Sequence, residues 1–380
     1  MKRLQQLLAG IVLSGLGTVV HADYTLNMPV GVTELSRETY GLHMMVIYIC
    51  AAIGLVVFGA MFYSIYAFRK EKHPVPATFH ENSKIEILWT IIPFLILIAM
   101  VYPATDLTIK HYDTENAEMT IKITGYQWRW RYDYVDEGFG FMSSLKADSN
   151  AARQIDSGIS PRKVHNYLQA VDHPLVIPVN TKIRFLMTSA DVIHAWWVPE
   201  FGWKRDAIPG FITDAWASID KVGIYHGACA ELCGRDHGFM PIVVDVRSKE
   251  DYQAWLAEKK LILEQDNAQA DRVWSKNELM VKGKDIYLSA CAGCHQPNGE
   301  GIKGSFPAIK ASPVATGDKD SHIELVLEGK GAMTGFAEAL SPVELAAVIT
   351  YQRNAFENNS GDLVQPAKIK EWLEDLGYDE

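Results

Sequence analysis

The sequence predicts a multidomain chain with three folded parts: a two-helix transmembrane hairpin, a β-sandwich and an all-α domain. Apolar runs at about residues 44–68 and 86–105 are each long enough to span a bilayer. Between residues 107 and 247, apolar and polar residues alternate, and β-branched and aromatic side chains are enriched, as is typical of strands. In residues 276–358, a helical spacing of Leu279, Gly283 and Tyr287 precedes a Cys-x-x-Cys-His string.

Residues 1–22 have the pattern of a secretory signal peptide. A basic start and a short apolar run lead to Val20 and Ala22, small residues suited to a cleavage site. A membrane anchor is the alternative, but the apolar run is short for a span. No cysteine directly follows Ala22, so nothing supports a lipoprotein anchor.

Residues 23–106 are predicted to form an N-terminal segment and the hairpin. The connection between the spans carries Arg69, Lys70, Lys72 and Lys84 against two glutamates, and is therefore expected in the cytoplasm. The chain beyond residue 106 is then extracytoplasmic. A buried pair of globular helices is the alternative interpretation.

Charge and cysteine content restrict the function. The net charge of −10 argues against nucleic acid as a partner and favours a basic protein partner. Of the five cysteines, Cys50 stands alone and the other four form two close pairs. This spacing predicts two cofactor sites rather than a disulfide framework.

One loop concentrates ligands suited to copper. Cys229, Cys233, His237 and Met240 follow one another within twelve residues, and His194 lies in an apolar, aromatic stretch upstream. Two thiolates can bridge two copper ions, with the two histidines as terminal ligands and the methionine as a weak axial ligand. A disulfide between the two cysteines is the alternative. The alternation predicts an antiparallel β-sandwich or barrel, and in such a fold these ligands would come from loops at one end.

A second cofactor site follows residues 248–275, which are interpreted as a short helix and linker. Cys291, Cys294 and His295 form the attachment string of c-type haem, in which both thiols bond the haem vinyl groups and the histidine binds the iron. A redox-active cysteine pair or half of a zinc site is the alternative. A zinc site would need two more ligands, and none is evident at suitable spacing.

The sixth iron ligand is expected to be Met333, shortly before the last helix of this domain. His322 is the rival ligand and Met280 a more distant one, while Met333 could also be an ordinary core residue. Ser341-Pro342-Val343-Glu344 predicts the start of a helix that runs through Tyr351, and Gly283 predicts a close approach of another helix. Residues 359–380 are set apart as a C-terminal tail.

Three strings in this chain together resemble one family. The Cys-x-Glu-x-Cys-Gly-x-x-His-x-x-Met string at residues 229–240 is similar to the dicopper CuA site of subunit II of the haem-copper cytochrome c oxidases. The Gly-x-Gln-Trp-x-Trp string at residues 125–130 also occurs in that family, and the haem string resembles the fused class I cytochrome c domain that some members carry. The resemblance implies a cupredoxin-like sandwich.

The resemblance also implies residue roles. The glutamate matching Glu231 gives its backbone carbonyl to one copper, and its carboxylate faces a magnesium ion shared with subunit I. The tryptophan matching Trp128 is the surface residue through which electrons reach CuA, although packing is the simpler role for an aromatic strand residue. A glutamate at the place of Glu86 lies near the mouth of a proton path, where an interfacial charge facing water is the simpler interpretation. A proline like Pro307 supports the proximal histidine.

For the whole chain, the resemblance implies subunit II of a bacterial cytochrome c oxidase in the inner membrane, with the copper and cytochrome domains on the periplasmic side. Electrons would pass from a donor c-type cytochrome through one covalent haem c and the two copper ions to subunit I. Oxygen would be reduced there, coupled to proton pumping. Subunits I and III and the donor cytochrome are the implied partners.

The sequence departs from the family pattern at two places, and three other functions remain as alternatives. Arg129 and Arg131 place positive charge beside Trp128, which would repel a basic donor there, and Thr334 stands where the family often has proline. A quinol oxidase subunit would lack the copper ligands. A CuA-bearing nitric oxide reductase subunit would share most motifs, and a membrane-anchored electron shuttle would have no large haem-bearing partner.

Overall fold

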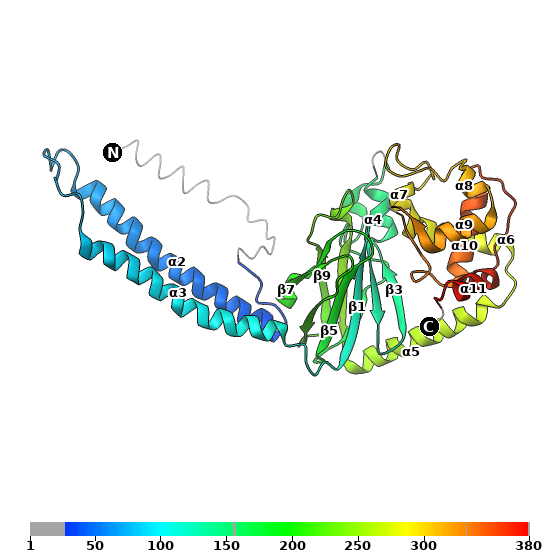
Figure 1. The fold of residues 1–380 in the computed structure, drawn as a ribbon, viewed down its shortest axis with the longest axis horizontal. Coiled ribbons are helices and arrows are strands. Elements are labelled where there is room, and N and C mark those ends of the chain that lie inside the picture. The colour runs from blue at the N-terminus through cyan, green and yellow to red at the C-terminus, as the bar shows by residue number, and fades with distance from the viewer. Residues whose placement is uncertain (1–26, 155–156, 332, 379–380) are drawn as a thin grey trace.

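The computed structural model describes residues 27–154, 157–331 and 333–378. A pair of long helices, a β-sandwich and a helical domain follow one another along the long axis of the molecule (Figure 1). This order confirms the predicted fold class. The signal peptide predicted for residues 1–22 lies outside the described residues.

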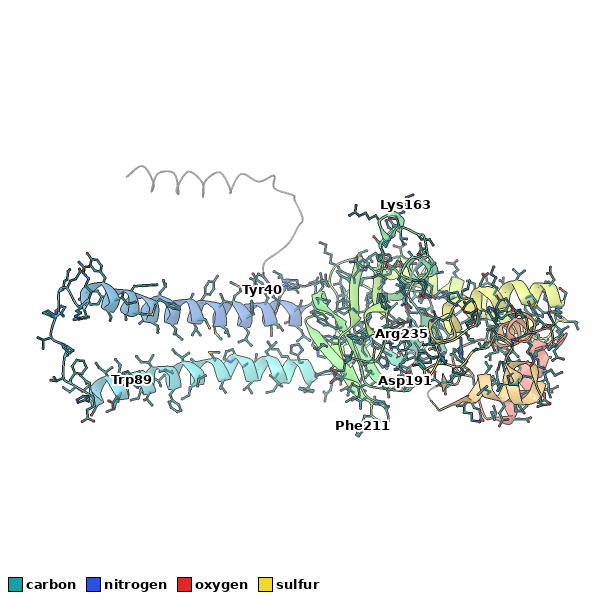
Figure 2. All side chains as sticks on the ribbon, turned by 90° about the horizontal axis from the view of Figure 1, so that it is seen from above. Tyr40, Trp89, Lys163, Asp191, Phe211 and Arg235 are labelled. Atoms are coloured by element: carbon teal, nitrogen blue, oxygen red, sulfur yellow. The ribbon has the colours of Figure 1, made fainter. Side chains whose placement is uncertain are left out.

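The hairpin consists of α2 (Glu34–Ala67) and α3 (Ser83–Tyr112). Both helices begin at capping residues: Thr33 forms a capping box with Ser36, and the Asn82 side chain accepts a hydrogen bond from the backbone N–H of Ile85. Both are long and apolar enough to cross a membrane, and their apolar side chains are largely exposed, as lipid contact requires. Trp89 lies at the end of the hairpin far from the sandwich and Tyr40 near it (Figure 2).

The near end of the hairpin is fixed to the sandwich. The Thr33 hydroxyl donates to Phe201 O at 2.9 Å, and Trp216 Nε1 donates to Lys110 O at 2.8 Å. Leu35 and Leu107 are buried together with the core of the sandwich. The two helices are therefore packed directly against the sandwich and are not joined to it by a flexible linker alone.

The sandwich has two five-stranded sheets, ordered β3-β2-β1-β5-β8 and β4-β10-β9-β6-β7. The pairs β1–β5 and β4–β10 are parallel and the other pairs are antiparallel, so the expectation of an antiparallel sandwich was wrong for one pair in each sheet. Alternation of apolar residues fixes which face of a strand is buried, but it carries no information on the direction of a distant neighbour. The strands are β1 (Met119–Tyr126), β2 (Arg129–Tyr134), β3 (Phe139–Ser143), β4 (Leu175–Pro178), β5 (Ile183–Ser189), β6 (His194–Val198), β7 (Trp203–Ala207), β8 (Thr213–Ala217), β9 (Gly223–Cys229) and β10 (Pro241–Arg247).

Aromatic side chains fill the space between the two sheets. Trp196 stacks on Phe185 with ring centroids 5.7 Å apart and lies 5.4 Å from the ring of Trp203. Strand β5 alternates buried and partly buried residues along its whole length, as a strand with one core face should. In the described part of this domain, the connections contain the short helices α4 (Ala147–Ala152), η1 (Pro161–Lys163), η2 (Pro199–Phe201) and η3 (His237–Phe239).

The segment interpreted as a short helix and linker is mostly one long helix, α5 (Lys249–Ala270). Tyr252, Trp255 and Leu256 are buried against the sandwich, whereas Ala270 is buried in the core of the helical domain. Only residues 271–275 separate α5 from the next helix. Because a helix is stiff, α5 ties the two domains together more rigidly than a flexible linker would (Figure 1).

The helical domain is built around a crossing of α6 and α10. Its elements are α6 (Lys276–Ile286), η4 (Tyr287–Cys291), α7 (Ala292–His295), α8 (Pro313–Thr316), α9 (Lys319–Glu328), β11 (Gly329–Lys330), β12 (Met333–Thr334), α10 (Pro342–Asn354) and α11 (Pro366–Asp375). Ser341 and Glu344 form the predicted capping box. A Cβ on Gly283 would clash with the backbone carbonyl of Ala347, which confirms the predicted close approach of another helix. The residues set apart as a tail contain α11, whose Ile369 and Leu373 are buried in this domain.

Candidate metal centre and haem cavity

The copper ligands predicted from the sequence converge at one end of the sandwich. His194 begins β6 and Cys229 ends the neighbouring strand β9, and the pairing of Trp196 with Cys229 brings the two ends together. Cys229 Sγ lies 3.8 Å from His194 Nδ1. The donor atoms of His194, Cys229 and Cys233 all lie within 4.8 Å of one another, as a shared metal site requires.

The loop after β9 brings the remaining donors to the same point. Cys233 Sγ lies 3.5 Å from both His237 Nδ1 and Met240 Sδ. The backbone oxygen of Glu231 lies 3.4 Å from Cys229 Sγ, while the side chain of Glu231 is exposed. Two sulfurs, two imidazoles, a thioether and a carbonyl therefore face one small volume. This donor set fits copper.

The two cysteines of the loop are free thiols in the structure. Their sulfurs are 3.8 Å apart, whereas a disulfide bond is about 2.05 Å long. The hydrogen bond from Cys233 lowers the pKa of Cys229 well below its usual value, and the same hydrogen bond together with burial raises the pKa of Cys233. Cysteine binds a metal as the thiolate, so metal binding at this pair would release protons.

Asp191 orients His194 and was not predicted from the sequence. Its Oδ1 lies 2.8 Å from His194 Nε2, and a carboxylate can only accept this hydrogen bond, so Nε2 carries the proton and Nδ1 faces the thiols with a free lone pair. Burial lowers the pKa of His194, but the hydrogen bonds with Asp191 and Cys229 outweigh it and raise the pKa overall. The spacing Asp-x-x-His is the signal that could have identified Asp191.

Further hydrogen bonds hold the loop in place. Asp236 is 3% exposed and accepts a hydrogen bond from Arg153 Nη2 at 2.7 Å. Gln127 Nε2 and Trp128 Nε1 both donate to Cys233 O, at 2.8 and 3.1 Å. Figure 2 shows Asp191 and Arg235 on the side of the sandwich near the helical domain.

Replacing Asp191 with asparagine is expected to weaken copper binding by about 10- to 100-fold, the usual cost of losing a carboxylate behind a ligating histidine. The amide keeps the size of the side chain but lacks the negative charge that increases the basicity of the imidazole. Competition with a copper chelator measures the affinity. Asp172→Asn is the matched control, because the Asp172 carboxylate lies 3.5 Å from His173, which is not among the copper donors. Equal affinities for both variants would contradict the role of Asp191.

A cavity of about 700 Å³ lies in the helical domain and opens onto the sandwich. Cys291, Cys294 and His295 line it. His295 Nδ1 lies 2.8 Å from Pro307 O, and since a carbonyl can only accept, the ring must donate from Nδ1, which leaves Nε2 free to bind iron. Both cysteines are free thiols, and burial raises their pKa values, to about 12 for Cys291 and about 11 for Cys294. Two thiols, an oriented imidazole and a largely apolar lining fit a covalently bound haem.

Two candidates for the sixth ligand also line this cavity. Met333 is partly buried on β12, and His322 is 4% exposed on α9. Burial lowers the pKa of His322 to about 4, and its Nδ1 has no hydrogen-bond partner among the described residues. Met280, the third candidate, does not line the cavity.

The other two predicted residues lie in different places. Trp128 is partly buried and packs against the core of the sandwich beside the copper loop. Glu86 lies in the first turn of α3, where its Oε1 accepts a hydrogen bond from the backbone N–H of Asn82 at 3.2 Å. Glu86 thus caps the helix at the end of the hairpin remote from both cofactor sites.

Comparison with known proteins identifies the family. Residues 119–247 match the periplasmic domain and residues 21–107 the transmembrane domain of cytochrome c oxidase subunit II. The probable cytochrome c oxidase subunit 2 of Rickettsia conorii is 40% identical over 228 residues, which are 60% of this chain and 69% of that protein. The chain belongs to the cytochrome c oxidase subunit II family. Subunit 2 of Cereibacter sphaeroides is 36% identical over 238 residues, which are 60% of this chain and 78% of that protein.

The cytochrome c oxidase subunit II family accounts for the first two parts of the chain, and a second family matches the third. Residues 278–351 match the subunit III of cbb3-type cytochrome c oxidase, a cytochrome c domain. The crystal structure of the periplasmic domain of subunit II from Bradyrhizobium japonicum is 41% identical, with a TM-score of 0.33, and covers 39% of this chain and 96% of that one. The two family matches and the two candidate membrane-spanning helices make the protein a membrane-anchored component of a haem-copper oxidase, an oxidoreductase complex with other subunits. Its family domains imply CuA copper and haem c.

Proposed function

We propose that this chain receives electrons from a donor c-type cytochrome at one covalent haem c and passes them through two CuA copper ions to subunit I of the oxidase. The observation that carries the proposal is the placement of two donor sets in neighbouring domains: the donors around Cys229 and Cys233, and the cavity beside Cys291 and Cys294. When bound, both groups carry single electrons. No nucleophile or acid–base pair is required of this chain.

The chain's own residues bind and orient the two groups. Cys229 and Cys233 would bridge the copper ions, with His194, His237, Met240 and the carbonyl of Glu231 as the remaining ligands. Asp191 holds the His194 ring in one tautomer. In the cytochrome domain, Cys291 and Cys294 would form the thioether bonds, and Pro307 holds His295 ready for iron. These two histidines are thus held in one orientation before a metal binds, which would limit their rearrangement during electron transfer.

The remaining assignments extend the proposal to the membrane. The hairpin would cross the bacterial inner membrane twice, with both cofactor domains in the periplasm, because the connection at residues 68–82 carries the positive residues. Subunit I would reduce oxygen and pump protons, and subunit III would complete the complex. The exposed carboxylate of Glu231 would face a magnesium ion shared with subunit I, and Glu86 would lie near the entrance of a proton path.

Metal and haem content tests this function. The full chain, assembled with its oxidase partners and with haem-maturation machinery present, is expected to contain two copper ions and one covalent haem c. Electron-spin resonance should show one unpaired electron shared by both coppers. A copper-free chain with a disulfide between Cys229 and Cys233, despite copper supply, would contradict the proposal. Turnover with oxygen rather than nitric oxide identifies the reaction of the complex.

Met333→Leu is expected to remove the methionine-to-iron absorption band at the red end of the oxidised spectrum, while haem attachment through the cysteines remains. The thioether is the only group that leucine removes, and its loss should also lower the haem potential. His322→Leu is the matched control, because His322 lines the same cavity. If the wild-type protein lacked the band, and His322→Leu rather than Met333→Leu changed the haem spectrum, the sixth ligand would be His322.

A further inference from the structure

The cytochrome domain covers Trp128, the tryptophan beside the copper loop. The ring of Phe306 meets the ring of Trp128 edge to face, with centroids 6.0 Å apart and planes at 88°. On its other side, Trp128 Nε1 donates to Cys233 O at 3.1 Å. Trp128 therefore contacts both Phe306, which lines the haem cavity, and the copper loop.

Through this contact, a continuous series of bonded or contacting groups connects His295 in the haem cavity with the copper loop. His295 donates to Pro307 O, and Pro307 is joined through the backbone to Phe306. Phe306 touches Trp128, which is hydrogen-bonded to the carbonyl of Cys233. The only through-space step in this series is the ring contact between the two domains.

Arg129 anchors the same interface. It lies on β2 of the sandwich but is only 5% exposed, because it inserts into the cytochrome domain. Its Nη1 donates to Ala290 O at 2.6 Å, and its guanidinium lies 4.5 Å from the ring centroid of Phe336. Among the described residues, Arg129 forms no ion pair and its Nε has no hydrogen-bond partner, so the contacts with Ala290 O and Phe336 offset part of the cost of burying this charge.

Arg131 differs from Arg129 although it is two residues away on the same strand. Its Nε donates to Asp133 Oδ1 at 2.7 Å within the sandwich. The two arginines that the sequence singles out beside Trp128 therefore have different roles. One fixes the cytochrome domain, and the other pairs with a carboxylate of its own domain.

We propose that the Trp128 surface is the docking site of the chain's own cytochrome domain, and that Phe306 is the residue from which an electron crosses to Trp128. This inference rests on the proposed function. One electron leaves ferrous haem c, which becomes ferric, and is gained by the oxidised copper pair, with no proton moved. An external one-electron donor, a soluble c-type cytochrome, then delivers its electron to the cytochrome domain and not to Trp128.

The charge of the cytochrome domain fits such a donor. Residues 276–380 contain 10 lysines and arginines against 16 aspartates and glutamates, a net charge of −6 out of the −10 of the whole chain. A basic protein is attracted by this domain, whereas Trp128 is already in contact with Phe306 of the chain's own cytochrome domain. The reduction of haem c by the donor should therefore slow as salt concentration rises.

The test uses the full chain in its assembled oxidase, with Arg129→Gln, Phe306→Leu and the control Arg131→Gln. Loss of the charge-assisted hydrogen bond in Arg129→Gln is expected to lower the equilibrium constant for domain docking about 10-fold or more. Hydroxyl-radical footprinting should then label Trp128 faster than in the wild-type protein. Arg131→Gln should leave the labelling rate unchanged.

Electron transfer gives the second measurement. After flash reduction of haem c, Phe306→Leu is expected to slow the arrival of the electron at copper, while metal content and both midpoint potentials stay the same. Equal labelling of Trp128 in the wild-type and Arg129→Gln proteins would overturn the docking proposal, as would reduction of copper before haem c by a soluble cytochrome. An unchanged transfer rate in Phe306→Leu would overturn the role of Phe306. If the proposed function itself were wrong, the wild-type chain would lack copper or haem. Metal and haem content therefore distinguishes that outcome from failure of the docking proposal.

Discussion

Cys229→Ser is expected to abolish the copper centre while the covalent haem c remains. Cys229 lies at the middle of the donor set, with Cys233 Sγ and His194 Nδ1 each at 3.8 Å and Glu231 O at 3.4 Å. A serine hydroxyl is a hard donor that does not ionise near neutral pH, so it cannot replace a bridging thiolate between two copper ions. Copper content per chain should fall from two to near zero, together with the optical and electron-spin signals.

Cys50→Ser is the matched control for this variant. Cys50 lies on α2, is exposed and is far from both cofactor sites in the sequence and the fold. Its replacement should leave copper and haem contents at their wild-type values. If copper and its spectrum survived the loss of Cys229, the binuclear assignment would be wrong.

Ligand spacing made the candidate copper site predictable from the sequence. The four loop residues lie within one connection, and the only distant member, His194, lies in an apolar stretch with few competing histidines. The structure brings their donor atoms together. Asp191 was missed because its role depends on the rotamer of His194, which a ligand pattern does not specify.

The parts that sequence patterns did not predict depend on contacts between distant segments. Alternation in residues 107–247 predicted a sandwich, but not which strands would be parallel neighbours. The length of α5 was underestimated, since a polar helix without an obvious apolar face gives a weak periodic signal. Arg129 was expected to affect an external partner, whereas it faces the chain's own cytochrome domain. The sequence shows that a residue is charged, but it does not show which surface of the folded protein will cover that residue.

Gly283→Val is expected to disrupt the cytochrome domain and leave the copper domain intact. A Cβ at Gly283 would clash with the Ala347 carbonyl and with Cβ of Tyr351, so α6 and α10 would have to separate. The Ala347 carbonyl is a backbone group, so it cannot rotate away from the new side chain as a flexible side chain could. Separation of the two helices would also disrupt the packing of fully buried residues on α10, such as Val343 and Ile349. Overpacking of this kind costs about 3 kcal/mol or more, a large part of the roughly 5–15 kcal/mol that stabilises a domain.

Haem and copper contents of the same preparation measure this effect separately in the two domains. Covalent haem should fall strongly and the thermal transition followed by haem absorbance should move to lower temperature, while copper stays at two ions per chain. Gly41→Val is the control, because a Cβ at Gly41 on α2 would meet nothing within 4 Å. A Gly283→Val protein with normal haem content and an unshifted transition would mean that α6 and α10 can separate at little cost. A parallel loss of copper would mean instead that the copper loop needs the docked cytochrome domain for its own stability.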